Sequence, residues 1–246
     1  GITLSFTFVV LMFTRDHKSL NQPVEENSDS VHLDRPGTKT QVGRILSSGQ
    51  FWIIAMIFFG IYGTFITLQG LWATPFLMTA LDIERVLASK LNMLIPVGVI
   101  IGSPLLGWLL NRYALDKRKT LITILGVYNL TWIGVVFFFN YLGIIGLSLV
   151  LLIMGIVAGG FISTLWGIVG EITPSKILGL TSGVLNPAPF LGVAVFQVLT
   201  GAILNHSDRV GDMYSIAGFK NAFLLCLLCS IVCMGFSLLI RKPGSS

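Results

Sequence analysis

Two amide side chains, Gln69 and Asn186, are the residues in this sequence best suited to bind a polar solute away from water. Each lies inside a long uncharged and apolar run. An amide in such surroundings is costly unless it is hydrogen-bonded, and it offers donors and an acceptor to a ligand. We therefore predict that both contact a solute. The alternative is that each bonds a neighbouring helix, which requires the same chemistry.

Aromatic residues lie close to these amides. Tyr62 precedes Gln69 by about two helical turns, so the two side chains share a helix face. Trp72 and Trp166 are further candidates for solute contact, although indoles in such runs also serve as packing or interface residues. We predict a binding face that combines amide and aromatic groups.

Two prolines follow Asn186 and should interrupt its helix. Pro187 and Pro189 each remove a backbone donor and leave carbonyl oxygens without their usual partners. A broken helix near a binding site is a common transporter device, so we assign both prolines to gating. A static kink filled by packing is the alternative, because membrane helices tolerate proline.

Other kinds of chemistry find no support. The sequence has no Gly-x-Ser-x-Gly elbow, no His-Glu-x-x-His motif and no nucleotide loop ending in Gly-Lys-Ser/Thr. The three cysteines, Cys226, Cys229 and Cys233, share one apolar run without His or carboxylate neighbours, so we expect no metal. We predict that the protein is not an enzyme and uses no cofactor. We also predict that it binds no nucleic acid, because its basic residues sit in short segments between apolar runs.

The composition indicates which elements must position these residues. Charged residues make up 11% of the chain and apolar residues 54%, whereas soluble domains have about 25% charged residues. Lipid is therefore the expected solvent. Six uncharged runs are long enough to cross a membrane as helices. They are residues 45–81 (with the span near 51–79), 91–111, 120–139, 141–170, 177–205 and 222–240.

The predicted fold is an all-α polytopic membrane bundle of six full transmembrane helices. Residues 1–14 are interpreted as the tail of a truncated transmembrane helix, because they are apolar but too few to span. Residues 15–48 lack helical or strand periodicity and are interpreted as a flexible cytoplasmic linker. The six-helix domain then covers residues 49–242, and residues 243–246 form a tail.

Basic residues define the orientation. Most of the 16 Lys and Arg residues lie in the linker, in the second-to-third connection and near the C-terminus. Because positive residues concentrate on the cytoplasmic side, the linker and C-terminus should both be cytoplasmic.

Glycine spacing suggests an internal repeat. Gly98 precedes Gly107 by nine residues in the second run, and Gly192 precedes Gly201 by nine in the fifth. These runs are equivalent in a three-plus-three inverted repeat, which many transporters use. Three small-residue pairs should also let helices approach closely: Gly98 with Gly102, Gly155 with Gly159, and Gly179 with Gly183.

The second-to-third connection resembles a loop signature of the major facilitator superfamily. It runs Gly107-Trp-Leu-Leu-Asn111-Arg112-Tyr-Ala-Leu-Asp116-Lys117-Arg118-Lys119, with Asn111 where the signature usually has Asp. The segment from Gly170-Glu171 to Ser182-Gly183 resembles that family's tenth-to-eleventh helix region. The resemblance implies the end of helix 6, the central loop and helices 7 to 12, without the N-terminal half.

The resemblance also implies roles for particular residues. It places a solute site near the bilayer midplane, lined by the first, second, fourth and fifth of these helices. It also implies a cytoplasmic gate, for which we select Gly107, Asn111, Arg112 and Glu171. Ordinary interfacial charges are an equal alternative for Arg112 and Glu171.

We therefore expect a secondary transporter of a small organic solute that works by alternating access. Its partners would be the lipid bilayer, the solute and the missing N-terminal six-helix half, and its location the bacterial inner (plasma) membrane. No ionisable residue lies in the middle of a run, so a proton carrier is not evident here. A channel, or a non-transporting membrane scaffold or receptor, is the alternative.

Overall fold

Six membrane-length helical spans make up the described part of the chain. The computed structural model describes residues 38–210 and 213–241, so residues 1–14, most of the linker and the tail at 243–246 lie outside the described residues. The spans are Gly49–Leu81, Arg85–Arg112, Lys117–Phe137, Phe139–Ile172, Ser175–Asn205 and Ile216–Ser237. All six predicted spans are confirmed, and the chain is an integral membrane protein.

Several spans consist of more than one helical segment. The first contains α3 (Gly49–Ile57), the π-helical η1 (Phe58–Tyr62), α4 (Gly63–Thr67), the π-helical η2 (Leu68–Trp72) and α5 (Ala73–Leu81). The second contains α6 (Arg85–Asn92) and α7 (Leu94–Arg112), and the fifth contains η3 (Ser175–Ile177), α10 (Leu178–Leu185) and α11 (Pro187–Asn205). The third, fourth and sixth are α8 (Lys117–Phe137), α9 (Phe139–Ile172) and α12 (Ile216–Ser237).

Two predicted boundaries need correction. Part of the supposed linker is helical, because α2 occupies Thr38–Leu46. The sixth span begins at Ile216 instead of residue 222, since Ser215 caps it by accepting a hydrogen bond from the Gly218 amide. The all-α description also omits one feature of the described chain, a short antiparallel hairpin of β1 (Arg209–Val210) and β2 (Met213–Tyr214).

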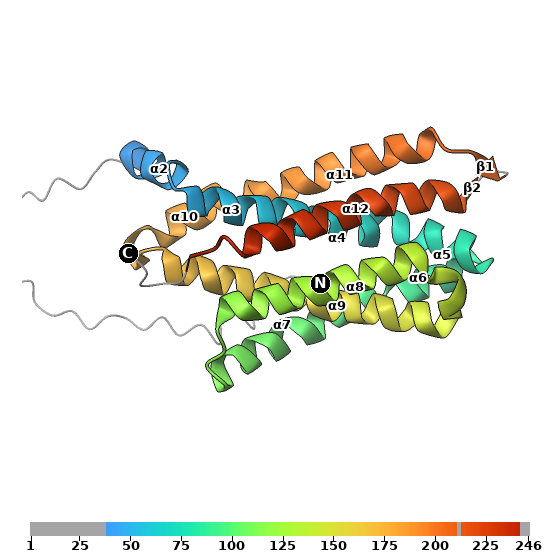
Figure 1. The fold of residues 1–246 in the computed structure, drawn as a ribbon, viewed down its shortest axis with the longest axis horizontal. Coiled ribbons are helices and arrows are strands. Elements are labelled where there is room, and N and C mark those ends of the chain that lie inside the picture. The colour runs from blue at the N-terminus through green and yellow to red at the C-terminus, as the bar shows by residue number, and fades with distance from the viewer. Residues whose placement is uncertain (1–37, 211–212, 242–246) are drawn as a thin grey trace, which may run out of the picture. The chain divides into compact units, whose positions relative to one another are not determined.

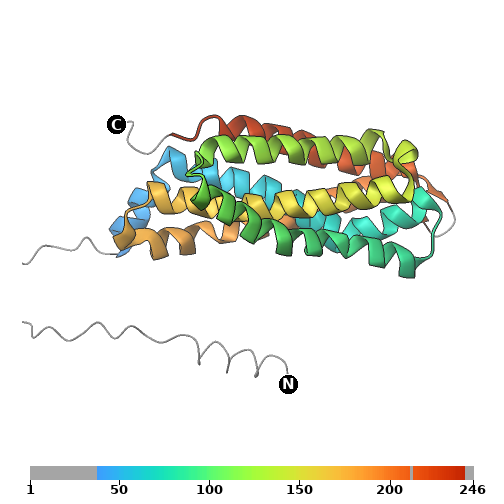
Figure 2. The ribbon, with the colours of Figure 1, turned by 90° about the horizontal axis from the view of Figure 1, so that it is seen from below.

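The helices pack in a pattern that is repeated between the two groups of three. The second span packs on the fourth through α7 and α9, and the fifth packs on the first through α11, η1 and α4. The third and sixth spans, α8 and α12, contact each other and lie side by side in Figure 1. Helices α7 and α9 also contact each other and are neighbours in Figure 2. This arrangement is the one that an inverted three-plus-three repeat requires.

Glycines form the seam between α7 and α9. A Cβ atom at Gly98 or Gly102 would collide with the α9 backbone at Leu152 or Ile156. Reciprocally, a Cβ at Gly155 would collide with the α7 backbone. The predicted close approach of these two glycine pairs is confirmed, because only a residue without Cβ fits there.

A second seam joins α11 to the first span. A Cβ at Gly192 would collide with the Phe59 carbonyl, and one at Gly63 would collide with the Gly192 backbone. Gly98 and Gly192, which the repeat aligns, therefore each allow close packing against the backbone of a neighbouring span. Gly179 and Gly183 have open space around them, so the third predicted pair is wrong for the described bundle.

Polar contacts in the core join α8 to α12 and to the first span. The Ser230 hydroxyl donates to Asn129 Oδ1 over 2.7 Å, linking α12 to α8. The Thr64 and Tyr128 hydroxyls lie 3.1 Å apart, linking the first span to α8. Each contact satisfies buried polar groups and fixes the depth at which the helices meet.

Candidate functional site

Gln69 lines a cavity in the described part of the bundle, and this cavity is larger than the one at the basic end of the bundle. The cavity holds about 530 Å³ and lies between the first and second spans and the hairpin. Its lining residues are Gln69, Gly70, Leu71, Thr74, Pro75, Met78, Thr79, Arg85, Ser89, Met213 and Tyr214. Ligand pockets commonly enclose about 300–1,000 Å³, so the volume suits a small organic molecule.

The polar groups around this cavity suit a hydrogen-bonding solute. The Gln69 side-chain amide makes no hydrogen bond within the described part of the chain. The Thr79 hydroxyl donates to the Pro75 carbonyl, and Arg85 brings a single positive charge to the lining. A free amide beside hydroxyl groups can donate to and accept from a polar ligand.

Local backbone irregularity presents Gln69 to the cavity. It lies in η2, a π-helical segment, and Pro75 follows shortly after. π-Helical segments leave carbonyls shifted from their usual partners and often occur at functional sites. Asn92 of the second span donates from Nδ2 to the Gln69 carbonyl over 3.0 Å and to the Thr74 hydroxyl over 3.3 Å.

Tyr62 lies near the middle of the first span, beside the glycine seam. Its ring makes an edge contact with Phe190 of α11, with 6.0 Å between ring centroids. Its hydroxyl makes no hydrogen bond to any described residue. Tyr62 is half-buried, so the hydroxyl is available for a ligand at mid-depth.

Gln69 and Asn186 lie at different depths. Gly63 meets Gly192 across the seam, and the two spans run in the same direction. Gln69 is six residues beyond Gly63, while Asn186 is six residues before Gly192. At 1.5 Å per residue the two amides are about 18 Å apart along the bundle, so one small solute cannot touch both at once.

Trp72 is packed within the bundle. Its indole nitrogen donates to the Thr200 hydroxyl over 2.8 Å, and its ring contacts Tyr214 and Phe219 edge-on. The side chain is 8% exposed, which leaves little of it for a solute. Trp166 is half-buried and its ring lies 5.1 Å from that of Phe58. These positions match the packing alternative better than direct solute contact.

The fifth span is interrupted at Asn186, as its prolines predict. Helix α10 ends at Leu185 and α11 begins at Pro187. Asn186 keeps right-handed helical torsion angles, so the interruption is a change of hydrogen bonding and not an unwound loop. The Asn186 side chain is exposed and Pro189 is buried.

The charged residues selected for the gate, Arg112 and Glu171, form no ion pair with each other. Glu171 pairs with Lys117, whose Nζ lies 2.6 Å from Glu171 Oε1 and 3.5 Å from the Gly167 carbonyl. Arg112 is exposed and forms no ion pair with any described residue. Gly107 has open space around it and Asn111 is exposed.

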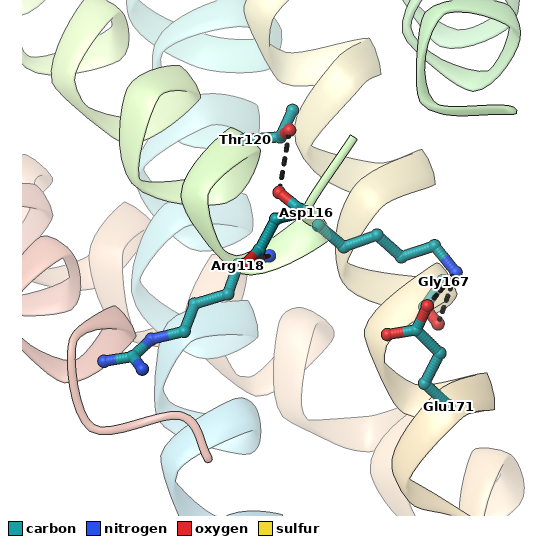
Figure 3. Close-up of polar contacts among 6 residues, drawn as sticks. Asp116, Arg118, Thr120, Gly167 and Glu171 are labelled. Carbon is teal, nitrogen blue, oxygen red and sulfur yellow. Dashed lines mark hydrogen bonds and ion pairs between the residues drawn. The ribbon is translucent and has the colours of Figure 1, made fainter. Parts of the chain in front are cut away.

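This ion pair joins two helices of the same bundle. Lys117 begins α8 and Glu171 lies in the last turn of α9. Figure 3 shows Arg118 and Glu171 on opposite sides of Asp116. The Arg118 guanidinium donates to the Leu238 carbonyl at the end of α12. Neighbouring cations of one turn therefore tie the ends of three helices together.

Asp116 organises this turn. Its carboxylate accepts hydrogen bonds from the Arg118 and Lys119 amides at 2.9 and 3.1 Å. Its carbonyl accepts one from the Thr120 hydroxyl (Figure 3). Asp116 is thus a helix N-cap. Its position just before a long helical run is a signal that sequence reading could have used.

The sequence reasoning missed the contacts that join the helices. Lys117 and Arg118 were assigned to the loop signature and to the orientation signal, without a partner for either, and Asn129 was not singled out. An Asn within an apolar run, aligned in depth with a Ser in another run, is the available signal for the Asn129–Ser230 bond. The sequence alone could not identify Ser230 as the partner of Asn129, because it does not show which helices are neighbours.

Comparison with known proteins places these features in context. The Major Facilitator Superfamily sequence model matches residues 1–197. A choline/ethanolamine transporter of the cat (Felis catus), FLVCR1, is 28% identical over 168 residues, covering 66% of this chain and 29% of that protein. The solved structure of the proton:xylose symporter XylE, bound to 6-bromo-6-deoxy-D-glucose, matches with a TM-score of 0.66 and 16% identity. That match covers 82% of this chain and 46% of the other. The chain spans less than half the length of either protein.

Proposed function

Because this chain belongs to the major facilitator superfamily, we propose that it forms one six-helix half of a secondary transporter. It moves a small polar organic solute across the bilayer by alternating access, together with a second six-helix half. The observation that carries this proposal is the unbonded Gln69 amide, with hydroxyl groups and Arg85 beside it, in a cavity of about 530 Å³.

The solute meets the candidate residues in sequence along its path. Gln69, Tyr62 and Asn186 lie at successive depths on the first and fifth spans, and each offers an available polar group. A partner half opposite these spans supplies the remaining contacts at each depth. Alternating access then exposes the two ends of the path in turn.

The solute is one that this half recognises through hydrogen bonds. The described charged residues lie in connections, in α2 or within two turns of a span's end, and Arg85 is the one cation that lines the cavity. An intramembrane ionisable group would mark proton coupling. Coupling therefore resides in the partner half, or the solute moves by facilitated diffusion.

The end of the bundle that carries α2 and the Lys117–Arg118–Lys119 run faces the cytoplasm. This assignment follows the concentration of positive residues at that end. The bacterial inner membrane expected from the sequence is part of the same proposal.

A ligand-dependent melting screen tests the function. The chain is purified in detergent with and without a co-expressed N-terminal half, and small sugars, amino alcohols and other polar solutes are added. We expect a solute that raises the melting temperature of the paired form, with the shift lost in Gln69→Ala. Asn140→Ala removes an exposed amide at the start of α9 and serves as the control, since its shift should be retained.

Other outcomes separate the alternatives. If no solute shifts the paired form while this half folds stably alone, a membrane scaffold or receptor becomes the better explanation. If reconstituted protein passes solute at rates that do not saturate, a channel becomes the better explanation. The second outcome also overturns alternating access.

A further inference from the structure

A second cavity lies at the basic end of the bundle, away from the Gln69 cavity. It holds about 300 Å³ between the start of α8, the end of α9 and the segment after α12. Its lining residues are Ala114, Leu115, Asp116, Lys117, Arg118, Ile168, Glu171, Ile172, Ile240 and Arg241. It therefore combines three cations and two carboxylates with an apolar wall.

The two carboxylates are already engaged. Asp116 caps α8, and Glu171 pairs with Lys117. Arg118 donates to a backbone carbonyl, that of Leu238, which carries no formal charge. Arg241 makes its hydrogen bond through its backbone amide, to Gln50 Oε1 at 2.9 Å. Neither guanidinium, that of Arg118 or that of Arg241, forms an ion pair with a carboxylate among the described residues.

One donor in this cluster is both buried and unpaired. The Nε atom of Arg118 is shielded from solvent and has no hydrogen-bond partner among the described residues. A buried donor without an acceptor costs free energy, and more so on a charged group. Because Arg118 lines the cavity, an anionic oxygen bound there would offer this guanidinium an acceptor.

The helix terminus adds to the positive potential. α8 begins with Lys117, Arg118 and Lys119, although the positive end of a helix dipole favours anions. Three cations at this position are destabilising unless negative charge lies nearby. Asp116 and Glu171 supply part of that charge, and the cations of the cluster still outnumber the carboxylates.

The cavity lies where a membrane presents phosphate groups. The spans Lys117–Phe137, Phe139–Ile172 and Ile216–Ser237 all have an end at this cavity, so it is level with the lipid headgroups. Leu115, Ile168 and Ile240 provide apolar surface beside the cations. Basic pockets between transmembrane helices at such positions bind phosphate-bearing headgroups.

We propose that this cavity binds a phosphate ester, held by the guanidinium groups of Arg118 and Arg241. Arginine suits this role because its planar fork donates two hydrogen bonds to phosphate oxygens. Occupancy ties α8 and the segment after α12 together through the bound anion. The site is separate from the solute path and does not depend on the proposed transport activity.

Lipid titration tests the proposal. The purified 246-residue chain in a neutral detergent receives phosphatidylglycerol, diacylglycerol or inorganic phosphate, and binding is read by native mass spectrometry and melting temperature. We expect phosphatidylglycerol to bind and raise the melting temperature, and diacylglycerol, which lacks phosphate, to do neither. If inorganic phosphate alone binds equally tightly, the site stands and its ligand is a soluble phosphate.

Matched variants identify the site. Arg118→Gln combined with Arg241→Gln should weaken phosphatidylglycerol binding by about tenfold to a hundredfold, the range for lost charge-assisted hydrogen bonds. Lys119→Gln removes an exposed cation of the same run that does not line the cavity, and should leave binding unchanged. Equal binding by the double variant, or an equal loss in Lys119→Gln, overturns the proposal.

The single variant Arg241→Gln tests the site without the risk that the protein fails to fold. Arg118→Gln removes the bond to Leu238 and can loosen the end of α12. Arg241→Gln keeps the backbone bond to Gln50, so the fold should be intact. It should still weaken binding by several-fold, and unchanged binding in this variant also overturns the proposal.

Discussion

The seam between α7 and α9 and the seam between α11 and the first span use the same close approach but join different kinds of helix. Gly98 packs on the α9 backbone near Leu152, and Gly192 packs on the first span at the Phe59 carbonyl. After Gly143, α9 is a regular helix to its end at Ile172. The first span instead contains two π-helical segments, η1 and η2.

This difference coincides with the distribution of polar groups. Ten residues after Phe59 the first span has Gln69, and ten residues after Leu152 α9 has Ile162. Gln69 lines the larger cavity, whereas Ile162 packs against the apolar core. The repeat thus preserves the close helix packing in both groups of three. The first span differs from α9 in that it is irregular beside the proposed solute path.

Glycine substitutions should have the largest effect and test whether the two seams are equivalent. We expect Gly155→Ala and Gly192→Ala each to lower the free energy of unfolding by about 1–3 kcal/mol, because the new Cβ collides with backbone. Unfolding in mixed detergent micelles measures both. Gly107→Ala and Gly179→Ala meet open space and serve as controls without expected loss. A large cost at only one seam would break the equivalence.

The second-largest effect is expected from a substitution that acts on the first span, the one with π-helical segments. Asn92→Leu removes the bonds to the Gln69 carbonyl and the Thr74 hydroxyl, at a cost of about 0.6–1.7 kcal/mol. Amide hydrogen exchange of η2 should become faster, because its carbonyls lose an external partner.

Asn129→Leu is the matched control for this experiment. It removes the bond between α8 and α12 at a similar energetic cost, away from η2. Exchange in η2 should then be unchanged. Faster exchange in η2 in both variants would mean that the irregular segment responds to global destabilisation and not to Asn92.

Sequence reading predicted the repeated features better than the irregular ones. Six apolar runs identified the spans, and two glycine pairs identified the residues of the seam between α7 and α9, since length and the absence of a Cβ are local properties. The seam between α11 and the first span was not predicted, although the repeat aligned Gly192 with Gly98. The helix α2 was missed because residues 38–46 are polar and short, and the π-helical segments leave no local pattern. The partner of Glu171 was not predictable, because Arg112 and Lys117 are equally plausible until the positions of α8 and α9 are known.

Charge substitutions at the basic end should have smaller effects. Lys117 and Glu171 are 26% and 40% exposed, so their pair should contribute under about 1 kcal/mol. A double-mutant cycle of Lys117→Met and Glu171→Gln measures it. The same cycle with Arg112→Met should give no coupling. Coupling to Arg112 and not to Lys117 would mean that Glu171 pairs with the other charged residue selected for the gate.

Tyr62→Phe should have the smallest effect on stability and sharpens the comparison most. The hydroxyl has no partner among the described residues, while the ring packs on Phe190, so the free energy of unfolding should change by less than about 0.5 kcal/mol. Its removal should weaken solute binding about threefold to tenfold, the range for one neutral hydrogen bond. Thr64→Val shows the opposite pattern, because its buried hydroxyl bonds Tyr128, so stability falls and solute binding does not. If Tyr62→Phe instead costs stability and spares binding, the first span serves packing at mid-depth as α9 does, and its irregularity has no connection with the solute.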